Sequence, residues 1–210
     1  MKTKPLILAL LAGLSLSGAA QAALFDRGGG MIYDNVLNIT WLQDANYAKT
    51  SGYVADGLMN WWGATGWATN LTYGGYSDWR LPTALNADGS GPCGPDYNCT
   101  GSEMGHLFYV TGGLTAGQRI SASPTLDQFF TNMQDHWIYW SGTEQGDNNA
   151  WVFHTLHGYQ NDPVKWYSAF AWAVRSGDVA AAPIGNVPEP TTLLLLGLGL
   201  AGLGAMRRRG

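Results

Sequence analysis

All ten tryptophans and all ten tyrosines of this 210-residue chain lie between positions 33 and 172, in a segment with many glycines and few charged residues. Such a segment is expected to fold, because aromatic side chains bury large apolar areas. Ten tryptophans are more than the core of one small domain easily hides. We therefore expect some of them at the surface, where flat aromatic faces stack on sugars or pack against partner molecules.

The N-terminal residues have the pattern of a secretory signal peptide. Two lysines precede an apolar run at 6–16, and a small-x-small pattern occupies 20–22. This pattern predicts a signal peptide over residues 1–22 that signal peptidase removes between Ala22 and Ala23. A retained membrane anchor is the alternative, but the short apolar run and the good cleavage site favour removal.

The C-terminal residues form a second apolar stretch. Residues 191–206 carry no charge, and a helix of this length would span about 24 Å, less than the roughly 30 Å of a bilayer core. Three arginines follow directly, and a basic cluster beside an apolar stretch favours the cytoplasmic side. We expect this helix to hold the protein in the membrane, with the domain outside and the arginines inside: Arg207, Arg208 and Arg209.

The Pro-Glu-Pro sequence before this stretch completes a known pattern. Residues 187–210 contain that motif, the apolar stretch and the arginines in order, and they closely resemble the PEP-CTERM sorting signal of Gram-negative bacteria. The resemblance implies that Pro188, Glu189 and Pro190 direct exosortase, a membrane protease that processes the tail. It also implies export across the inner membrane and delivery to the cell surface or the extracellular space.

The chain between the two signals fits one domain over residues 23–179, followed by a small-residue linker over 180–186. Of the 11 basic and 15 acidic residues, 6 and 14 lie between the signal peptide and the tail, so the net charge there is about 6 − 14 = −8. No basic patch is visible, which argues against nucleic acid as a partner.

The residue pattern predicts strands at both ends of this domain and helices between them. We expect a β-hairpin over 23–42 and strands over 137–141, 150–156 and 169–175. Asn60 is a suitable N-cap for a first helix, Thr100 and Glu103 fit a capping box for a second helix that ends near Val110, and a shorter helix is expected near 125–133. The fold class is then α+β, with a mainly antiparallel sheet, two or three short helices and pairing of the first and last strands, in addition to the signal and tail helices.

Two cysteines frame a short loop. Cys93 and Cys99 enclose the turn-forming sequence GPDYN. In an exported chain this spacing favours a local disulfide that staples the loop. A metal or redox site is the alternative, but no further cysteine is present to complete a zinc set.

Three stretches together resemble a known family: YGGYSDWRLPT at 73–83, YWSGTE at 139–144, and NAWVFHTLHGYQ with the later AWAVR within 149–175. They are similar to the Lcl C-terminal domains, also known as DUF1566. The resemblance implies a C-type-lectin-like fold and a surface protein of a kind that binds sulfated polysaccharides. The chain departs from shorter members by the insertion at 84–99. It also lacks the EPN, QPD and WND calcium motifs of true C-type lectins, and its charge of about −8 disfavours sulfated ligands.

Candidate ligand-binding residues are found in the aromatic and polar loops. Trp137, Trp151 and Trp166 lie near polar loops and are candidates for sugar stacking, with a place in the core as the alternative. Calcium is a possible ligand of the oxygen-rich loop at 144–149, which residues 161–162 could approach, and an ordinary polar turn is the alternative. The four residues predicted to bind it are Glu144, Asp147, Asn149 and Asp162.

Catalytic motifs are absent, and we assign no catalytic residue and no cofactor other than the possible calcium. GxSxG, GxxxxGK and HExxH do not occur. His154 and His157 are expected on opposite faces of a strand. Asp78 and Arg80 are expected to form a salt bridge across Trp79, which we place in the core.

The sequence therefore predicts a secreted surface or matrix module that binds polysaccharide or another envelope component. Binding would rest on aromatic stacking and on hydrogen bonds from Asp and Asn side chains. An enzyme acting on surface polymers and a purely structural matrix protein are the alternatives.

Overall fold

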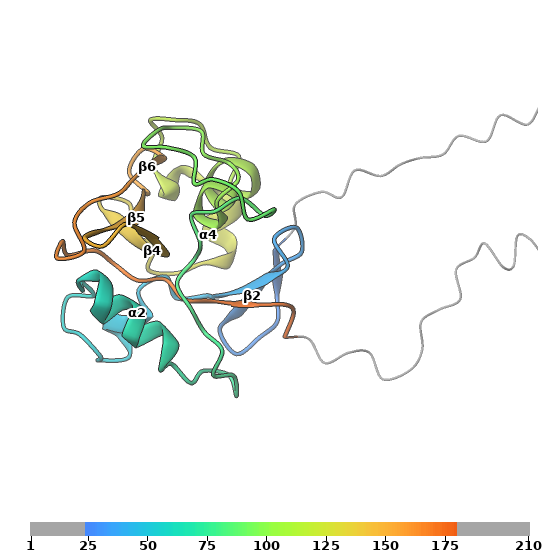
Figure 1. Ribbon diagram of the computed structural model, residues 1–210. Coiled ribbons are helices and arrows are strands. Elements are labelled where there is room, and N and C mark those ends of the chain that lie inside the picture. Colours follow the sequence, from blue (N-terminus) through green and yellow to red (C-terminus); the bar gives the residue numbers. More distant parts are fainter. Residues whose placement is uncertain (1–23, 180–210) are drawn as a thin grey trace, which may run out of the picture. The chain divides into compact units, whose positions relative to one another are not determined.

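The computed structural model describes residues 24–179 (Figure 1). The expected signal peptide, the linker at 180–186 and the sorting tail with its membrane helix lie outside these residues. Within the described part, no helix has both the length and the apolar character needed to cross a bilayer. The core of this part draws on residues from Leu24 to Val174, so we expect residues 23–187 to fold without the tail.

The elements are short, and strands at both ends enclose the helices, as expected for an α+β protein. In chain order they are β1 (Leu24–Asp26), β2 (Met31–Asp34), β3 (Ile39–Leu42), α1 (Tyr47–Thr50), α2 (Trp61–Thr69), α3 (Glu103–Gly105), η1 (His106–Thr111), η2 (Ile120–Ala122), α4 (Pro124–Phe129), β4 (Ile138–Gln145), β5 (Asn149–His154), β6 (Tyr159–Asn161) and β7 (Val174–Ser176).

The first sheet joins the two ends of the domain. Its strand order is β1-β2-β3-β7, and all neighbours are antiparallel, with Trp41 of β3 opposite Val174 of β7. The turn from β1 to β2 contains three consecutive glycines with positive φ, a conformation that residues with a Cβ rarely adopt. The predicted hairpin is thus confirmed, and the predicted pairing of the chain ends occurs through β3 rather than through the first strand.

The second sheet contains β4, β5 and β6 in that order, also antiparallel. The expectation of one sheet is therefore wrong. The predicted last strand divides between the sheets: Phe170 exchanges backbone hydrogen bonds with Ile138 and Trp140 of β4, and only Val174–Ser176 reaches the first sheet. The alanines between these points are fully buried, because the segment passes through the core from one sheet to the other.

Helix α2 begins as predicted. The Asn60 side chain accepts a hydrogen bond from Gly63 N at 2.9 Å, and the helix buries Trp61, Ala64 and Trp67. At residues 103–111 the helix forms, but the predicted capping box is wrong: Ser102, not Thr100, caps it by accepting from Gly105 N at 3.1 Å. Figure 1 shows that the segment between these helices crosses the domain in an irregular path.

Tryptophan side chains connect segments that are far apart in the sequence. Trp172 N–H donates to Leu42 O at 2.7 Å, and Trp140 N–H donates to Met59 O at 2.8 Å. Three further indoles also donate to main-chain carbonyl groups: Trp61, Trp79 and Trp137. Trp41, by contrast, is fully buried without a hydrogen-bond partner for its N–H among the described residues.

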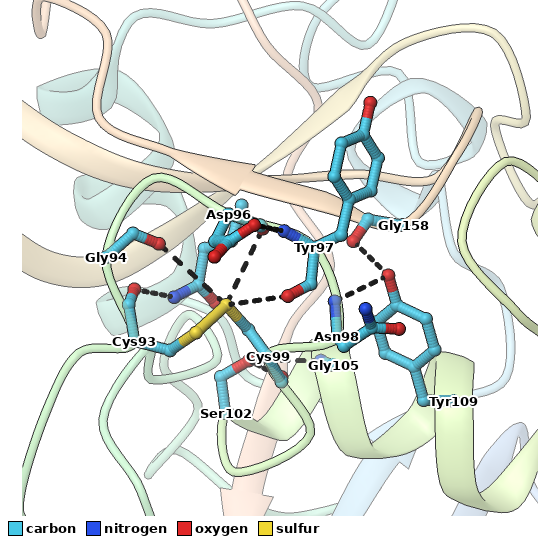
Figure 2. Close-up of a disulfide and its surroundings, with 11 residues drawn as sticks. Cys93, Gly94, Asp96, Tyr97, Asn98, Cys99, Ser102, Gly105, Tyr109 and Gly158 are labelled. Atoms are coloured by element: carbon cyan, nitrogen blue, oxygen red, sulfur yellow. Dashed lines mark hydrogen bonds between the residues drawn. A yellow bond between two sulfur atoms is a disulfide. The ribbon is translucent and has the colours of Figure 1, made fainter.

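The disulfide between Cys93 and Cys99 forms as predicted. It closes a loop that docks on the outer edge of β6, where Asp96 and Gln160 exchange two backbone hydrogen bonds of 3.0 Å. Figure 2 shows the Tyr109 hydroxyl on the other side of this loop, where it accepts from Asn98 N and donates to Gly158 O. The loop covers a sheet edge that would otherwise be open to pairing with other chains.

We expect Trp172→Phe to lower the free energy of unfolding by about 1 kcal/mol more than Trp41→Phe, because only the first change leaves a buried carbonyl without its donor. Both indoles are fully buried, so the loss of ring volume is matched. Urea unfolding of both variants measures the difference. Equal losses would show that the indole hydrogen bond adds nothing beyond packing.

Candidate functional site

Two pairs of aromatic rings lie around one turn at the surface, and each pair has one ring in the turn. Trp166 and Tyr167 are consecutive in this turn, which is closed by a hydrogen bond from Tyr167 N to Val164 O. The centre of the Trp166 ring lies 4.6 Å from that of the Trp62 ring on α2. The Tyr167 and Trp137 rings are stacked, with an angle of 18° between their planes and 6.2 Å between their centres. We call these four aromatic residues the aromatic surface; Trp166 is 74% exposed and the others 41–44%.

Lys165 fixes the turn that carries the aromatic surface. Its backbone N–H donates to Asn148 O at 2.8 Å, and its carbonyl accepts from Trp61 N at 2.9 Å. Within this turn the Lys165 side chain is buried, whereas that of the next residue, Trp166, is exposed. The ammonium lies 4.8 Å from the centre of the Trp61 ring, a cation–π contact.

The buried ammonium of Lys165 lies inside the β4–β5 turn. Its side chain is only 3% exposed. The nitrogen forms an ion pair with Glu144 Oε2 and donates to Asp147 O at 2.9 Å and Gly146 O at 3.2 Å. A lysine that leaves water needs such partners, and here main-chain carbonyls provide two of the three.

The residues predicted to bind calcium gather around this turn, but in other roles. Asn149 donates from its side chain to Asp162 O at 2.7 Å, so this pair approaches as expected. Asp147 contributes its carbonyl rather than its carboxylate, and a lysine occupies the centre. No group of three or more His, Cys, Asp or Glu side chains suited to a metal occurs between residues 24 and 179. Calcium binding stays a prediction, and the Lys165 ammonium argues against it.

A hollow of about 330 Å³ lies beside the aromatic surface and shares Trp137 with it. Its polar groups include Asp135 and His136, whose side chains are 3.0 Å apart, and Asp135 also accepts from the Ser121 hydroxyl. The hollow thus combines a mainly apolar lining with a few polar groups, which suits a ligand that has an apolar face and polar substituents. Its lining residues are Leu58, Met133, Gln134, Asp135, His136, Trp137 and Phe170.

The three tryptophans singled out from the sequence have different environments. Trp137 and Trp166 are exposed, as a stacking role requires. Trp151, on strand β5, is only 3% exposed, so its burial favours the alternative that the sequence left open over a stacking role. Trp62 was missed as a candidate, although the helical spacing of Trp61, Ala64 and Trp67 predicts one apolar face and leaves Trp62 outside it.

The charged pairs differ from those expected. Asp78 does not pair with Arg80; it binds Arg175, with Arg175 Nε 2.8 Å from Asp78 Oδ1. Arg80 instead forms two hydrogen bonds to the Glu103 carboxylate, at 2.7 and 2.8 Å. The cause is that strand β7 and helix α3, both distant in sequence, bring better-placed partners than the neighbouring residue. The predicted burial of Trp79 is confirmed.

The sequence stretches quoted above converge on this ion pair. Glu103 also accepts from Thr83 N at 2.7 Å, and the hydroxyls of Thr83 and Thr143 are 3.1 Å apart. Arg80 and Thr83 belong to the WRLPT stretch, and Thr143 belongs to YWSGTE. The two stretches, far apart in the sequence, therefore meet in one hydrogen-bond network.

The histidines also differ from expectation. His154 and His157 do not lie on opposite faces, because β5 ends at His154 and the chain turns back. Their rings are stacked, with 16° between the ring planes and 5.2 Å between the ring centres. The His154 Nε2 lies 2.8 Å from Asn161 Oδ1. Burial lowers the pKa of His154 and also that of His106.

These features define a small α+β domain with a disulfide and an exposed aromatic surface. The chain belongs to the Lcl C-terminal domain family, whose pattern matches residues 30–175. A PEP-CTERM protein-sorting motif matches residues 186–209 and points to export and exosortase-dependent sorting to the cell surface or the extracellular space. A comparison with curated proteins finds no match.

We expect Lys165→Met to lower the free energy of unfolding by about 2 kcal/mol, because it removes the charge-assisted hydrogen bonds that a buried ammonium makes to the carbonyls of Gly146 and Asp147. The ion pair with Glu144 adds little, since that carboxylate is 56% exposed. Lys49, the other lysine of the described residues, is exposed, and Lys49→Met is the control, with an expected change within about 0.5 kcal/mol. Urea unfolding compares them, and similar values for both variants would contradict the role of Lys165.

We expect the domain to lose stability as the pH falls below about 6.5. Burial lowers the pKa of His154 and of His106 in the folded domain, so the unfolded chain binds more protons at these histidines as the pH falls, and acid favours unfolding. His154→Gln retains a polar contact to Asn161 and should flatten this dependence. Urea unfolding at about pH 7 and about pH 5.5 tests it; an unchanged slope in the variant would assign the effect elsewhere.

Proposed function

We propose that this protein is a surface or extracellular-matrix module of C-type-lectin-like architecture that binds polysaccharide through the aromatic surface. The observation that carries the proposal is the exposure of Trp166, Trp62, Trp137 and Tyr167 on both sides of one turn. Single exposed apolar residues are common, but an exposed apolar patch of several large side chains marks an interaction site. Sugar rings present flat C–H faces that suit such rings.

The rigidity of the turn supports a recognition role. Lys165 holds its own backbone between Asn148 and Trp61, so Trp166 loses little freedom when a ligand binds. Binding surfaces that are ordered in advance avoid the entropic cost of ordering them in the complex.

The charge distribution favours an uncharged polysaccharide. Four of the six basic residues in the described part form ion pairs with carboxylates: Arg27, Arg80, Lys165 and Arg175. The domain therefore offers few free cations to sulfate or carboxylate groups. Sorting to the cell surface or beyond supports the proposal, because that is where extracellular polysaccharide is found.

We expect Trp166→Ala to weaken polysaccharide binding by roughly tenfold or more, a change of about 1.4 kcal/mol, because it removes the most exposed ring. Calorimetric titration of residues 23–187 with the host's extracellular polysaccharide measures this. Tyr53 is 62% exposed and lies outside the aromatic surface, so Tyr53→Ala is the matched control and should bind normally.

The same titration with calcium and with a chelator tests the prediction for Glu144, Asp147, Asn149 and Asp162. A heat signal that disappears with chelator would support calcium. A flat titration in both conditions, across a broad glycan panel as well, would reject the carbohydrate proposal in favour of a structural role.

A further inference from the structure

Helix α2 carries two threonines on the same side as Trp62. Residues 62, 65 and 69 are three and seven positions apart, which places their side chains on one helix face. Thr65 and Thr69 line a separate hollow of about 390 Å³. Since a helix rises about 1.5 Å per residue, the hollow begins within about 5–10 Å of Trp62 along the axis.

The rest of this hollow comes from the network around Arg80. Arg80, Thr83 and Thr143 line it together with Leu81, Leu85 and Gly142. The Arg80 side chain is 36% exposed and its charge is balanced by Glu103. The hollow thus offers hydroxyl and guanidinium groups without a net charge, beside apolar surface from two leucines. Such a set suits a ligand rich in hydroxyl groups and disfavours an anion.

The Thr65 hydroxyl has no hydrogen-bond partner, although its oxygen is buried. A buried hydroxyl without a partner costs roughly 1–3 kcal/mol. Threonine in a helix uses two χ1 rotamers, and rotation from one to the other moves the hydroxyl to a different staggered position on Cβ. A ligand hydroxyl in the hollow would therefore gain a hydrogen bond from Thr65 without breaking one inside the protein.

We propose that this hollow is a second subsite that binds one neutral sugar residue, next to the aromatic surface. Thr65, Thr69 and Arg80 would contact its hydroxyl groups, and Leu81 and Leu85 its apolar face. The inference rests on the proposed function, since it assigns a sugar residue to a site along the helix that carries Trp62. The inference adds to the proposed function the polar contacts of this subsite and its preference for uncharged sugars.

Nuclear magnetic resonance of labelled residues 23–187 tests both ideas at once. The probes are glucose, galactose, mannose and N-acetylglucosamine, with glucuronate as the anionic comparison. The indole N–H signals of Trp62 and Trp166 report on the aromatic surface. The methyl signals of Thr65 and Thr69 and the Arg80 Nε–H signal report on the hollow. We expect at least one neutral sugar to shift the hollow signals in a saturable manner.

Each outcome separates the two proposals. Shifts at the indoles alone would overturn the subsite and leave the proposed function intact, whereas shifts at the hollow alone would support the subsite and reject the aromatic surface. A response of the Arg80 signal to glucuronate alone would overturn the preference for neutral sugars. No response to any probe would overturn the subsite.

A matched pair of variants separates binding from stability. Thr65→Val and Thr111→Val each remove a buried hydroxyl that has no partner, and Thr111 does not line this hollow. Both variants should be as stable as the parent chain or slightly more stable. Only Thr65→Val should weaken the sugar-induced shifts at Thr69 and Arg80, by at least threefold in apparent affinity. Equal shifts in both variants would overturn the role of the Thr65 hydroxyl.

Discussion

The structure depends on buried tryptophans whose indole N–H groups bind main-chain carbonyls of remote segments. Trp172 joins the end of the domain to Leu42 near its start, and Trp140 joins the second sheet to Met59 before helix α2. The strands are too short to hold the layers by backbone pairing alone. Each such indole buries a large apolar area and donates a hydrogen bond to a carbonyl. It therefore provides contacts between segments that longer strands provide in larger sheets.

This arrangement also positions the candidate site. Trp61 donates to Ser141 O and lies under the Lys165 ammonium, and the next residue, Trp62, faces solvent beside Trp166. The same helix therefore contributes one ring to the core and one to the surface. The rigid core fixes the exposed rings, which links the stability of the domain to its proposed binding of polysaccharide.

Features with local causes could be predicted, and those with remote causes could not. Asn60 caps its helix and Cys93 pairs with Cys99 because each partner lies within a few residues. Arg80 was assigned the wrong carboxylate, since Glu103 reaches it only after the intervening loop has folded back. For the candidate site, the sequence indicated Trp137 and Trp166 but could not distinguish them from the buried Trp151, whose burial depends on the other parts of the fold.

The sequence by itself determined the α+β class, the terminal sorting motif, the disulfide and an excess of aromatic residues that a core cannot hold. These follow from composition, short motifs and contacts between near neighbours. Only the tertiary structure decided which rings are exposed, which carboxylate each cation binds, and that Lys165 occupies the turn predicted for calcium. The physical reason is that burial and ion pairing depend on groups brought together by folding, such as Lys165 with the β4–β5 turn, and sequence spacing does not encode that proximity.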